Sequence, residues 1–246
     1  MQKLGLFFAI VILFFASCNK QKNPNPIAET ANVSIKFSNV VNGMPIVQSA
    51  MNYTTPAGNL YSVDLLKYYI SNVILIKEDG TQFKLNNYDL INAFDANFST
   101  VEASSVPNGK YTSMQFSVGV DKNRNHSGAQ DGDLDPQYNM IWTWSTGYIF
   151  FKHEGNFKNS SAATQALTFH LGTDNAYSTV QIPISLTVEG VGKTMNVTFD
   201  LNKMYNSPAI NFDVDNHRMS DQAADNKWIA DMVANTNDAF SFTGVQ

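Results

Sequence analysis

Cysteine is nearly absent from this sequence of 246 residues. Cys18 is the only one, so no intramolecular disulfide can form, even in an oxidising compartment. A metal site built from several thiolates is excluded for the same reason. Any site for a soft metal must therefore use the four histidines, the nine methionines or modified side chains.

A long apolar run is also missing. The run Leu4–Phe15 holds only about a dozen residues, whereas a bilayer-spanning helix needs roughly 20. Lys3 precedes this run, and Phe15-Ala16-Ser17-Cys18 follows it and matches the lipobox of bacterial lipoproteins. We therefore predict that residues 1–17 are a lipoprotein signal peptide and that Cys18 carries the lipid. An ordinary cleaved signal with an incidental cysteine is the alternative.

The segment after Cys18 is polar and is interrupted by Pro24 and Pro26. It lacks the acidic cluster that directs some lipoproteins to the cell surface. We expect residues 18–30 to be a tether in the periplasm, lipid-anchored to the outer membrane, with the cell surface as the alternative location. Contact with the membrane would then occur only through the anchor.

Charged residues make up only 15% of the chain, and their balance is acidic. Removal of residues 1–17 takes away one lysine, so the formal charge of −5 becomes −6. There is no basic stripe, which argues against a nucleic-acid partner. With 43% hydrophobic residues, the remaining chain can bury a substantial core. We expect one domain over residues 31–246.

Apolar residues at every second position predict strands with one buried face. The clearest stripes are Val33–Phe37, Thr112–Val118, Val180–Val188 and Met195–Phe199. Because alternating helix and strand patterns are missing, we predict an all-β fold, an antiparallel β-sandwich of the Greek-key or immunoglobulin-like type.

Turns and short helices complete this prediction. Glu78-Asp79-Gly80 predicts a hairpin that leads into a strand at 82–85, and Pro183 on the polar face of its strand indicates an edge or a bulge. Two short helices are expected, Val63–Tyr69 and Asp225–Asn235, the second with an apolar face that includes Trp228.

Residues 119–139 form a long polar, glycine-rich stretch between predicted strands. Loops of this length in compact domains are usually functional. One interpretation is a structural calcium site, because oxygen ligands alternate along it at Asp121, Asn123, Asn125, Asp131, Asp133 and Asp135. The EF-hand pattern fails, however, since His126 stands where glycine is required and Gly132 where glutamate is required.

Several motifs of this stretch and its surroundings resemble the MbnP-like family of periplasmic copper-associated proteins. They are GVD at 119–121, LDP at 134–136, MIWTW at 140–144 with GY at 147–148, FHLG at 169–172, and upstream LKYYISN at 66–72 and PNGKY at 107–111. The resemblance covers nearly all of residues 32–240. It implies a β-sandwich that binds copper, and in such proteins a partner di-haem, peroxidase-like protein oxidises a tryptophan to kynurenine, whose amine joins histidines at the metal.

The resemblance assigns candidate copper ligands residue by residue. His126 matches the histidine of an NH pair and His170 that of FHLG, while Trp142 and Trp144 match paired tryptophans, either of which could be modified. His153 is a possible additional ligand, although relatives often have an apolar residue there. Cysteines found in some members are absent here.

Elementary chemistry is compatible with this assignment. Imidazole suits copper, and soft or borderline ligands favour Cu(I). Trp142 and Trp144 would point to one face of a regular strand, where two indoles can keep water from a metal. His170 should point away from the core, because Leu167, Phe169 and Leu171 mark the buried face. The plainer interpretations are core or rim aromatics and solvated histidines, His153 and His217 included.

Signatures of common enzymes are missing, among them Gly-x-Ser-x-Gly, His-Glu-x-x-His and phosphate-binding glycine loops. We therefore predict a protein without enzymatic activity that captures copper or maintains its balance. Two other interpretations remain open. One is a module that binds a glycan or a protein through Trp142, Trp144 and Tyr148, and the other is a purely structural envelope protein.

Overall fold

The structure, a computed structural model, describes residues 29–143, 146–220 and 225–246. The predicted signal peptide, Cys18, most of the predicted tether and Trp144 lie outside these residues. In the described part of the chain, no helix is long and apolar enough to span a bilayer.

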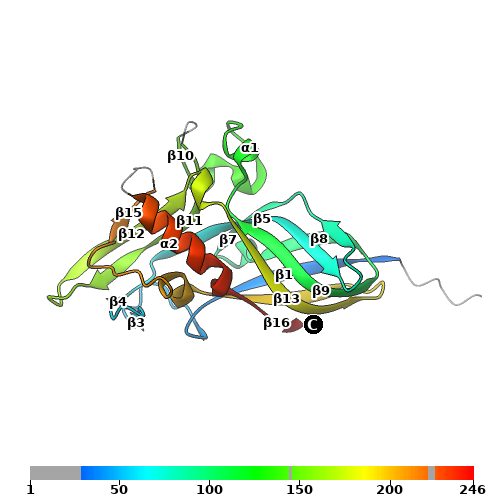
Figure 1. The fold of residues 1–246 in the computed structure, drawn as a ribbon, viewed down its shortest axis with the longest axis horizontal. Coiled ribbons are helices and arrows are strands. Elements are labelled where there is room, and N and C mark those ends of the chain that lie inside the picture. Colours follow the sequence, from blue (N-terminus) through cyan, green and yellow to red (C-terminus); the bar gives the residue numbers. More distant parts are fainter. Residues whose placement is uncertain (1–28, 144–145, 221–224) are drawn as a thin grey trace, which may run out of the picture.

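Two β-sheets make up most of the described chain (Figure 1). The smaller sheet contains β1 (Thr30–Val41), β2 (Met44–Pro45), β8 (Thr100–Pro107), β14 (Lys193–Asp200) and β16 (Phe240–Val245). The larger sheet contains β3 (Tyr53–Thr54), β4 (Leu60–Tyr61), β5 (Leu65–Lys77), β6 (Gln82–Lys84), β7 (Tyr88–Asn92), β9 (Gly109–Val118), β10 (Ile141–Thr143), β11 (Gly147–Lys158), β12 (Thr164–Gly172), β13 (Ser178–Val188) and β15 (His217–Arg218).

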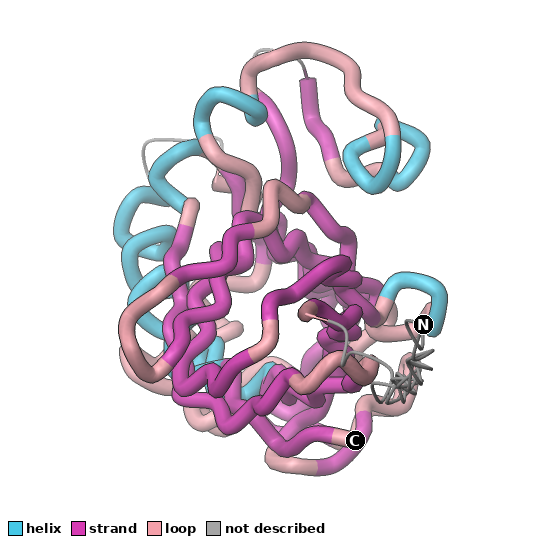
Figure 2. The backbone as a smooth tube through the Cα atoms, turned by 90° about the vertical axis from the view of Figure 1, so that its right-hand side faces the viewer, coloured by secondary structure: helices cyan, strands magenta, loops and turns pink. Residues whose placement is uncertain are grey.

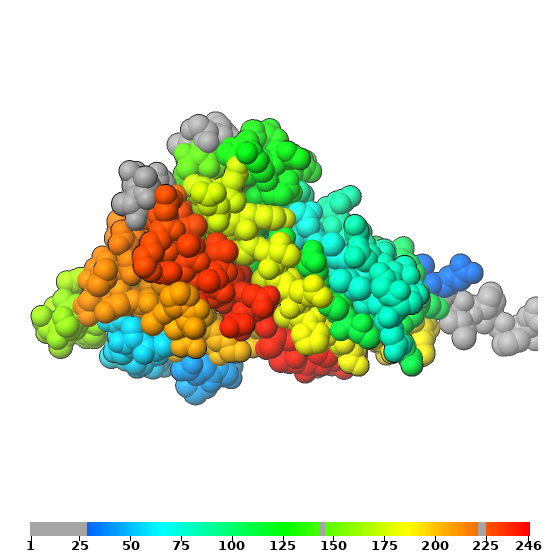
Figure 3. Space-filling model, in the orientation of Figure 1, coloured from blue at the N-terminus to red at the C-terminus, as the bar shows by residue number. Residues whose placement is uncertain are grey.

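Helices are short and lie between or beside the strands. The two α-helices of the described residues are α1 (Lys122–Asn125) and α2 (Asn226–Thr236). The 3-10 helices are η1 (Ala96–Phe98), η2 (Gly132–Leu134), η3 (Pro136–Tyr138), η4 (Asp174–Ala176), η5 (Leu201–Tyr205) and η7 (Asn237–Ala239). In the space-filling view α2, in orange-red, lies on the surface and contacts η5 and β13 (Figure 3).

The two sheets pack face to face through aromatic side chains. Phe199 of the smaller sheet lies 4.8 Å from Tyr68 of the larger one, and Phe240 lies 5.0 Å from Phe116, measured between ring centroids. Strand β13 shows why the sequence folds this way, since every second residue from Ser178 to Val188 is buried. The prediction of an all-β fold is confirmed.

Three details of the sequence prediction can be judged directly. The C-terminal helix is present as α2, with Trp228, Ile229 and Met232 buried. Pro183 lies at a register shift between β13 and β9, as expected for a bulge. The helix predicted at Val63–Tyr69 is wrong, because this segment leads into β5.

Strand β5 pairs with β9 and β11, and its residues Tyr68–Ser71 are all buried. Continuous burial there interrupts the alternation by which a strand is recognised, and the aromatic and β-branched residues of β5 favour a strand in this setting. A second difference is that β1 and β14 run parallel, with Val33 opposite Lys193, although an antiparallel sandwich was expected. β12 and β15 are also parallel.

The region of interest lies at one end of the larger sheet. β11 and β12 form an antiparallel pair, and β10 adds to β11 with Ile141 opposite Tyr148. The loop that joins β9 to β10 contains α1, η2 and η3 and projects beside β10 (Figures 1 and 2). Strand β12 ends in this region at Gly172.

Candidate metal site

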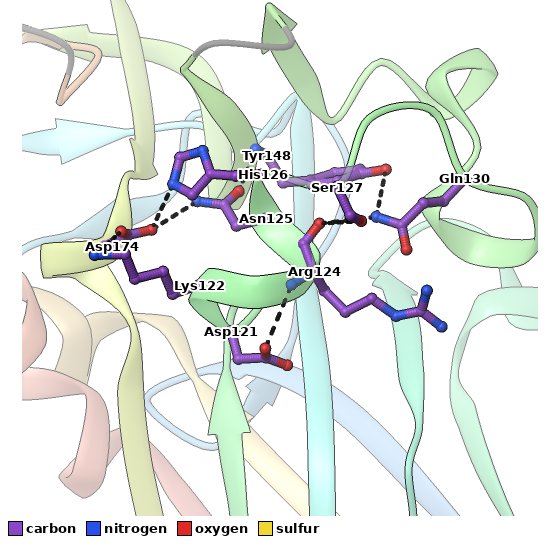
Figure 4. Close-up of polar contacts among 9 residues, drawn as sticks. All are labelled: Asp121, Lys122, Arg124, Asn125, His126, Ser127, Gln130, Tyr148 and Asp174. Atoms are coloured by element: carbon purple, nitrogen blue, oxygen red, sulfur yellow. Dashed lines mark hydrogen bonds and ion pairs between the residues drawn. The ribbon is translucent and has the colours of Figure 1, made fainter.

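His126 is the C-cap residue of α1 and lies in the projecting loop. Its Nε2 atom lies 2.9 Å from Oδ1 of Asp174, a residue that begins η4 just after β12 (Figure 4). Asn125 donates from Nδ2 to the same oxygen at 3.1 Å, and the Lys122 ammonium lies 3.7 Å from Oδ2. The His126 side chain is 39% exposed, so its ring can be reached from solvent. An open hollow of about 360 Å³ adjoins it, lined by His126, Thr146, Thr173, Asp174 and Asn175.

The pKa of the Asp174 carboxyl is lowered. Partial burial raises it, but hydrogen bonds from Asn125 and His126 and the nearby positive charges outweigh that effect. Asp174 is therefore ionised at neutral pH and acts as a hydrogen-bond acceptor only.

The projecting loop is held by its own polar groups. Asp121 caps α1 by accepting from the Arg124 backbone N–H and is also bonded by the Tyr88 hydroxyl. The Asn125 side chain accepts from the Tyr148 backbone N–H at 2.7 Å, and the Tyr148 hydroxyl donates to the Leu134 carbonyl. These hydrogen bonds fix the backbone of the loop next to His126.

Several of the oxygen-bearing side chains that suggested a calcium site make hydrogen bonds within the protein. Asp133 accepts from the Leu90 backbone N–H, and Asp135 accepts from that of Gln137 as a helix cap. Asn125 uses both ends of its amide, with Tyr148 and with Asp174. These side chains thus have structural partners within the protein.

The indole ring of Trp142 packs against Gly172, the last residue of β12. A Cβ atom placed on Gly172 would lie 2.7 Å from Cζ3 of the indole and 2.5 Å from the Tyr148 carbonyl oxygen, so the ring occupies the space that a side chain would take. The Trp142 Nε1 atom is buried and has no hydrogen-bond partner. Only a glycine at position 172 permits this contact.

His170 lies two residues before Gly172 on β12. Its Nε2 atom lies 2.7 Å from Oε1 of Glu154 on β11, and the same oxygen lies 3.4 Å from the Lys152 ammonium. The His170 Nδ1 atom is buried and has no hydrogen-bond partner. Burial lowers the pKa of His170, and Glu154 opposes this shift only in part, so the ring is neutral near pH 7.

The expected orientation of His170 needs a correction. Its ring does lie on the face opposite Leu167, Phe169 and Leu171, but that face is covered as well, and His170 is only 8% exposed. Glu154 of β11 bonds to the ring, and Trp142 packs against the neighbouring Gly172. His170 is therefore neither a surface histidine nor an exposed rim residue.

These positions put three candidate residues along one short segment. His170 is the first residue of this segment, the Trp142 ring packs against Gly172, and His126 is hydrogen-bonded to Asp174. They come from sequence positions up to 44 residues apart, 126 and 170. We call residues 170–174 with His126 and Trp142 the β12-end cluster.

Comparison with known proteins gives the family. The family model of MbnP matches residues 30–225. The solved structure of MbnP from Methylosinus trichosporium superposes with a TM-score of 0.55 at 17% identity, over 80% of this chain and 86% of that one. The chain belongs to the MbnP family. No curated protein matches the sequence. The superposition shows that this chain and that protein have the same fold.

His153 has a different place in this MbnP-family chain from the one expected. It is fully buried on β11, its Nδ1 atom lies 2.6 Å from the Tyr205 hydroxyl, and its ring packs near Phe169 and Tyr61. Burial lowers its pKa to about 4. The expectation of a solvated histidine is wrong, because the residue occupies a position in the aromatic core. His217 is exposed, as expected.

Tyr148 is another correction. It was one of three aromatic residues offered as a binding surface, but it is 1% exposed and its hydroxyl is bonded inside the loop. Trp142 is partly buried against Gly172. The described aromatic residues therefore do not form an exposed platform here.

Two carboxylates of the site were missed from the sequence. Glu154 contacts His170 only because of the register of β11 and β12, in which Glu154 stands opposite Thr168. Asp174 follows FHLG by two residues, but its bond to His126 joins positions 48 apart. Strand register and long-range contacts of this kind leave no local sequence signal. Within the described residues, no group of three or more His, Cys, Asp or Glu side chains is placed to hold a metal ion.

Proposed function

We propose that this MbnP-family protein binds copper as Cu(I) at the β12-end cluster and serves in copper capture or homeostasis. The observation that carries the proposal is that His126 contacts Asp174 and Trp142 packs against Gly172, both within four residues of His170 along the chain. These residues come from separate motifs that resemble those of copper-associated relatives. In this proposal the mature protein acts in the periplasm, held at the outer membrane by a lipid on Cys18.

The chemistry of the available donors fits copper. A neutral imidazole offers one nitrogen lone pair, and imidazole binds copper well. The His170 Nδ1 atom is buried without a partner, and a buried polar atom left unpaired costs about 1–3 kcal/mol. A bound metal ion would relieve that cost. No set of three His, Cys, Asp or Glu is placed together in the described residues, so a third ligand must be of another type.

A modified tryptophan would supply that third ligand. The family resemblance suggests oxidation by a di-haem partner protein, and kynurenine has an aromatic amine that tryptophan lacks. Trp142 is the candidate that its position supports, because its ring packs against Gly172, between His170 and the Asp174 that contacts His126. Trp144 remains the other candidate. The change breaks the C2–C3 bond of the indole, makes C3 a ketone with oxygen from water and releases the C2 carbon as formate. The di-haem partner would accept the electrons that this oxidation removes.

Metal analysis together with intact mass tests this function on protein purified from its native host. We expect copper in preference to zinc or calcium, and a mass shift located on the peptide that contains Trp142 and Trp144. Protein that contains no copper and takes up no Cu(I) after purification would overturn the proposal. Calcium retained in its place would instead support the structural site in the 119–139 loop.

A further inference from the structure

The two candidate histidines come from different elements, the end of α1 and strand β12, and each has a similar polar partner set. His126 Nε2 contacts the Asp174 carboxylate, which also faces Lys122, and His170 Nε2 contacts the Glu154 carboxylate, which also faces Lys152. Each carboxylate is therefore held between one imidazole and one ammonium group. Figure 4 shows the first arrangement, with the second ring nitrogen of His126 turned away from Asp174.

The chemistry of a carboxylate decides which ring nitrogen carries the proton. An ionised carboxylate can only accept hydrogen bonds, so at distances of 2.9 Å and 2.7 Å the Nε2 atom must be the donor. In a neutral ring the lone pair then remains on Nδ1. In His170 this is the buried atom that has no partner.

Resting on the proposed copper function, we propose that Glu154 and Asp174 are positioning residues that orient His170 and His126 and present the Nδ1 atom of each ring to the metal. Neither carboxylate touches the metal in this arrangement. A carboxylate that accepts the second ring N–H of a metal-bound histidine fixes its tautomer and orientation and makes the ligand more basic. Each lysine adds to the lowering of the pKa of its carboxylate, after the hydrogen bonds that the carboxylate accepts.

The two pairs differ in exposure, which gives them different tasks. The His170 side chain is 10% exposed, whereas that of His126 is 39% exposed. His170 is thus a fixed ligand inside the fold, and His126 is the ligand that an incoming ion meets first from the open hollow beside it. Loss of Asp174 should therefore affect the rate of copper uptake more than loss of Glu154.

The ring tautomers can be measured without copper by ¹⁵N NMR of the metal-free, full-length mature protein at mildly alkaline pH. We expect the neutral form of each ring, His126 and His170, to carry its proton on Nε2. Rings protonated on Nδ1, or rings with a freely exchanging mixture of both tautomers, would overturn the proposal. This measurement uses the wild-type chain, so it does not depend on whether any variant folds.

Variants then test the link to the metal. Glu154→Ala and Asp174→Ala should each weaken Cu(I) affinity by roughly 10- to 100-fold and release the tautomer of the adjacent histidine. Matched controls are Glu189→Ala and Asp238→Ala, which remove exposed carboxylates outside the cluster and its loop and should change neither. Undiminished affinity in both test variants would overturn the positioning role but leave the copper function intact. If the wild-type protein itself fails to bind Cu(I), the proposed function fails, and the role of the carboxylates toward a metal fails with it.

Discussion

The six-membered ring of Trp142 stands directly against Gly172, so that a Cβ atom at position 172 would lie 2.7 Å from Cζ3 of the indole. This contact joins β10 to the end of β12. Position 172 also tolerates no side chain because a Cβ atom there would lie 2.5 Å from the backbone carbonyl oxygen of Tyr148.

Gly172→Ala should displace Trp142 and destabilise the protein by about 1–3 kcal/mol, since a methyl group must be forced into occupied space. Chemical denaturation followed by tryptophan fluorescence measures both effects. Gly192→Ala is the matched control, because its nearest neighbour, the Asn32 carbonyl oxygen, lies 3.6 Å away. Equal stability of the two variants would show that the indole does not rest on Gly172.

His153 predicts a specific pH dependence of folding. Its pKa of about 4 in the folded protein lies below the ordinary value of 6.5, so the unfolded chain binds more protons between these values. The contribution to stability is complete above pH 6.5 and is lost as the pH falls toward 4, by about 3 kcal/mol in total.

Urea unfolding at several pH values within that window measures this loss. In His153→Gln, which keeps a polar group beside Tyr205, the free energy of unfolding should fall less steeply on acidification than in the wild type. His217→Gln removes an exposed histidine and should retain the wild-type slope. A steep slope that survives in His153→Gln would assign the acid sensitivity to other groups.

Conversion of a tryptophan to kynurenine can be assigned by substitution. If Trp142 is the modified residue, Trp142→Phe expressed in the native host should lose the mass change, whereas Trp144→Phe should keep it. Peptide mass spectrometry distinguishes the two, since the modification exchanges one carbon for one oxygen. The opposite pattern would move the third ligand to Trp144.

Lipid attachment at Cys18 can be tested by metabolic labelling with a fatty acid. The wild-type protein should incorporate the label and sediment with the outer membrane, and Cys18→Ser should lose the label. A protein that remains unlabelled in its wild-type form would favour the ordinary cleaved signal instead.

The strands were predictable where one face is buried and the other is exposed. The stripes at Val33–Phe37, Val180–Val188 and Met195–Phe199 lie within β1, β13 and β14. The hairpin from β5 into β6 was predictable from Glu78-Asp79-Gly80, but the first part of β5 was predicted as a helix because continuous burial at Tyr68–Ser71 interrupts the period of two. The parallel pairing of β1 with β14 joins residues about 160 positions apart and has no local signature.

The candidate site was predictable only in part. Family motifs singled out His126, Trp142 and His170, and the structure places His170 on β12, Trp142 against Gly172 and His126 against Asp174. The burial of His153 and His170 depends on which elements cover β11 and β12, and this is a tertiary property. Glu154 and Asp174 depend in the same way on strand register and loop position.

The most direct test of the central claim is a Cu(I) competition titration of the wild-type protein against the His126→Ala, His170→Ala double variant. The account predicts that the wild type takes up one copper ion per chain and that the double variant takes up none. His126 lies in an exposed pair and its loss should change stability little, but loss of buried His170 should cost about 1–3 kcal/mol, so circular dichroism must first show that the variant is folded. Copper affinity that stays undiminished in a folded double variant would contradict the account.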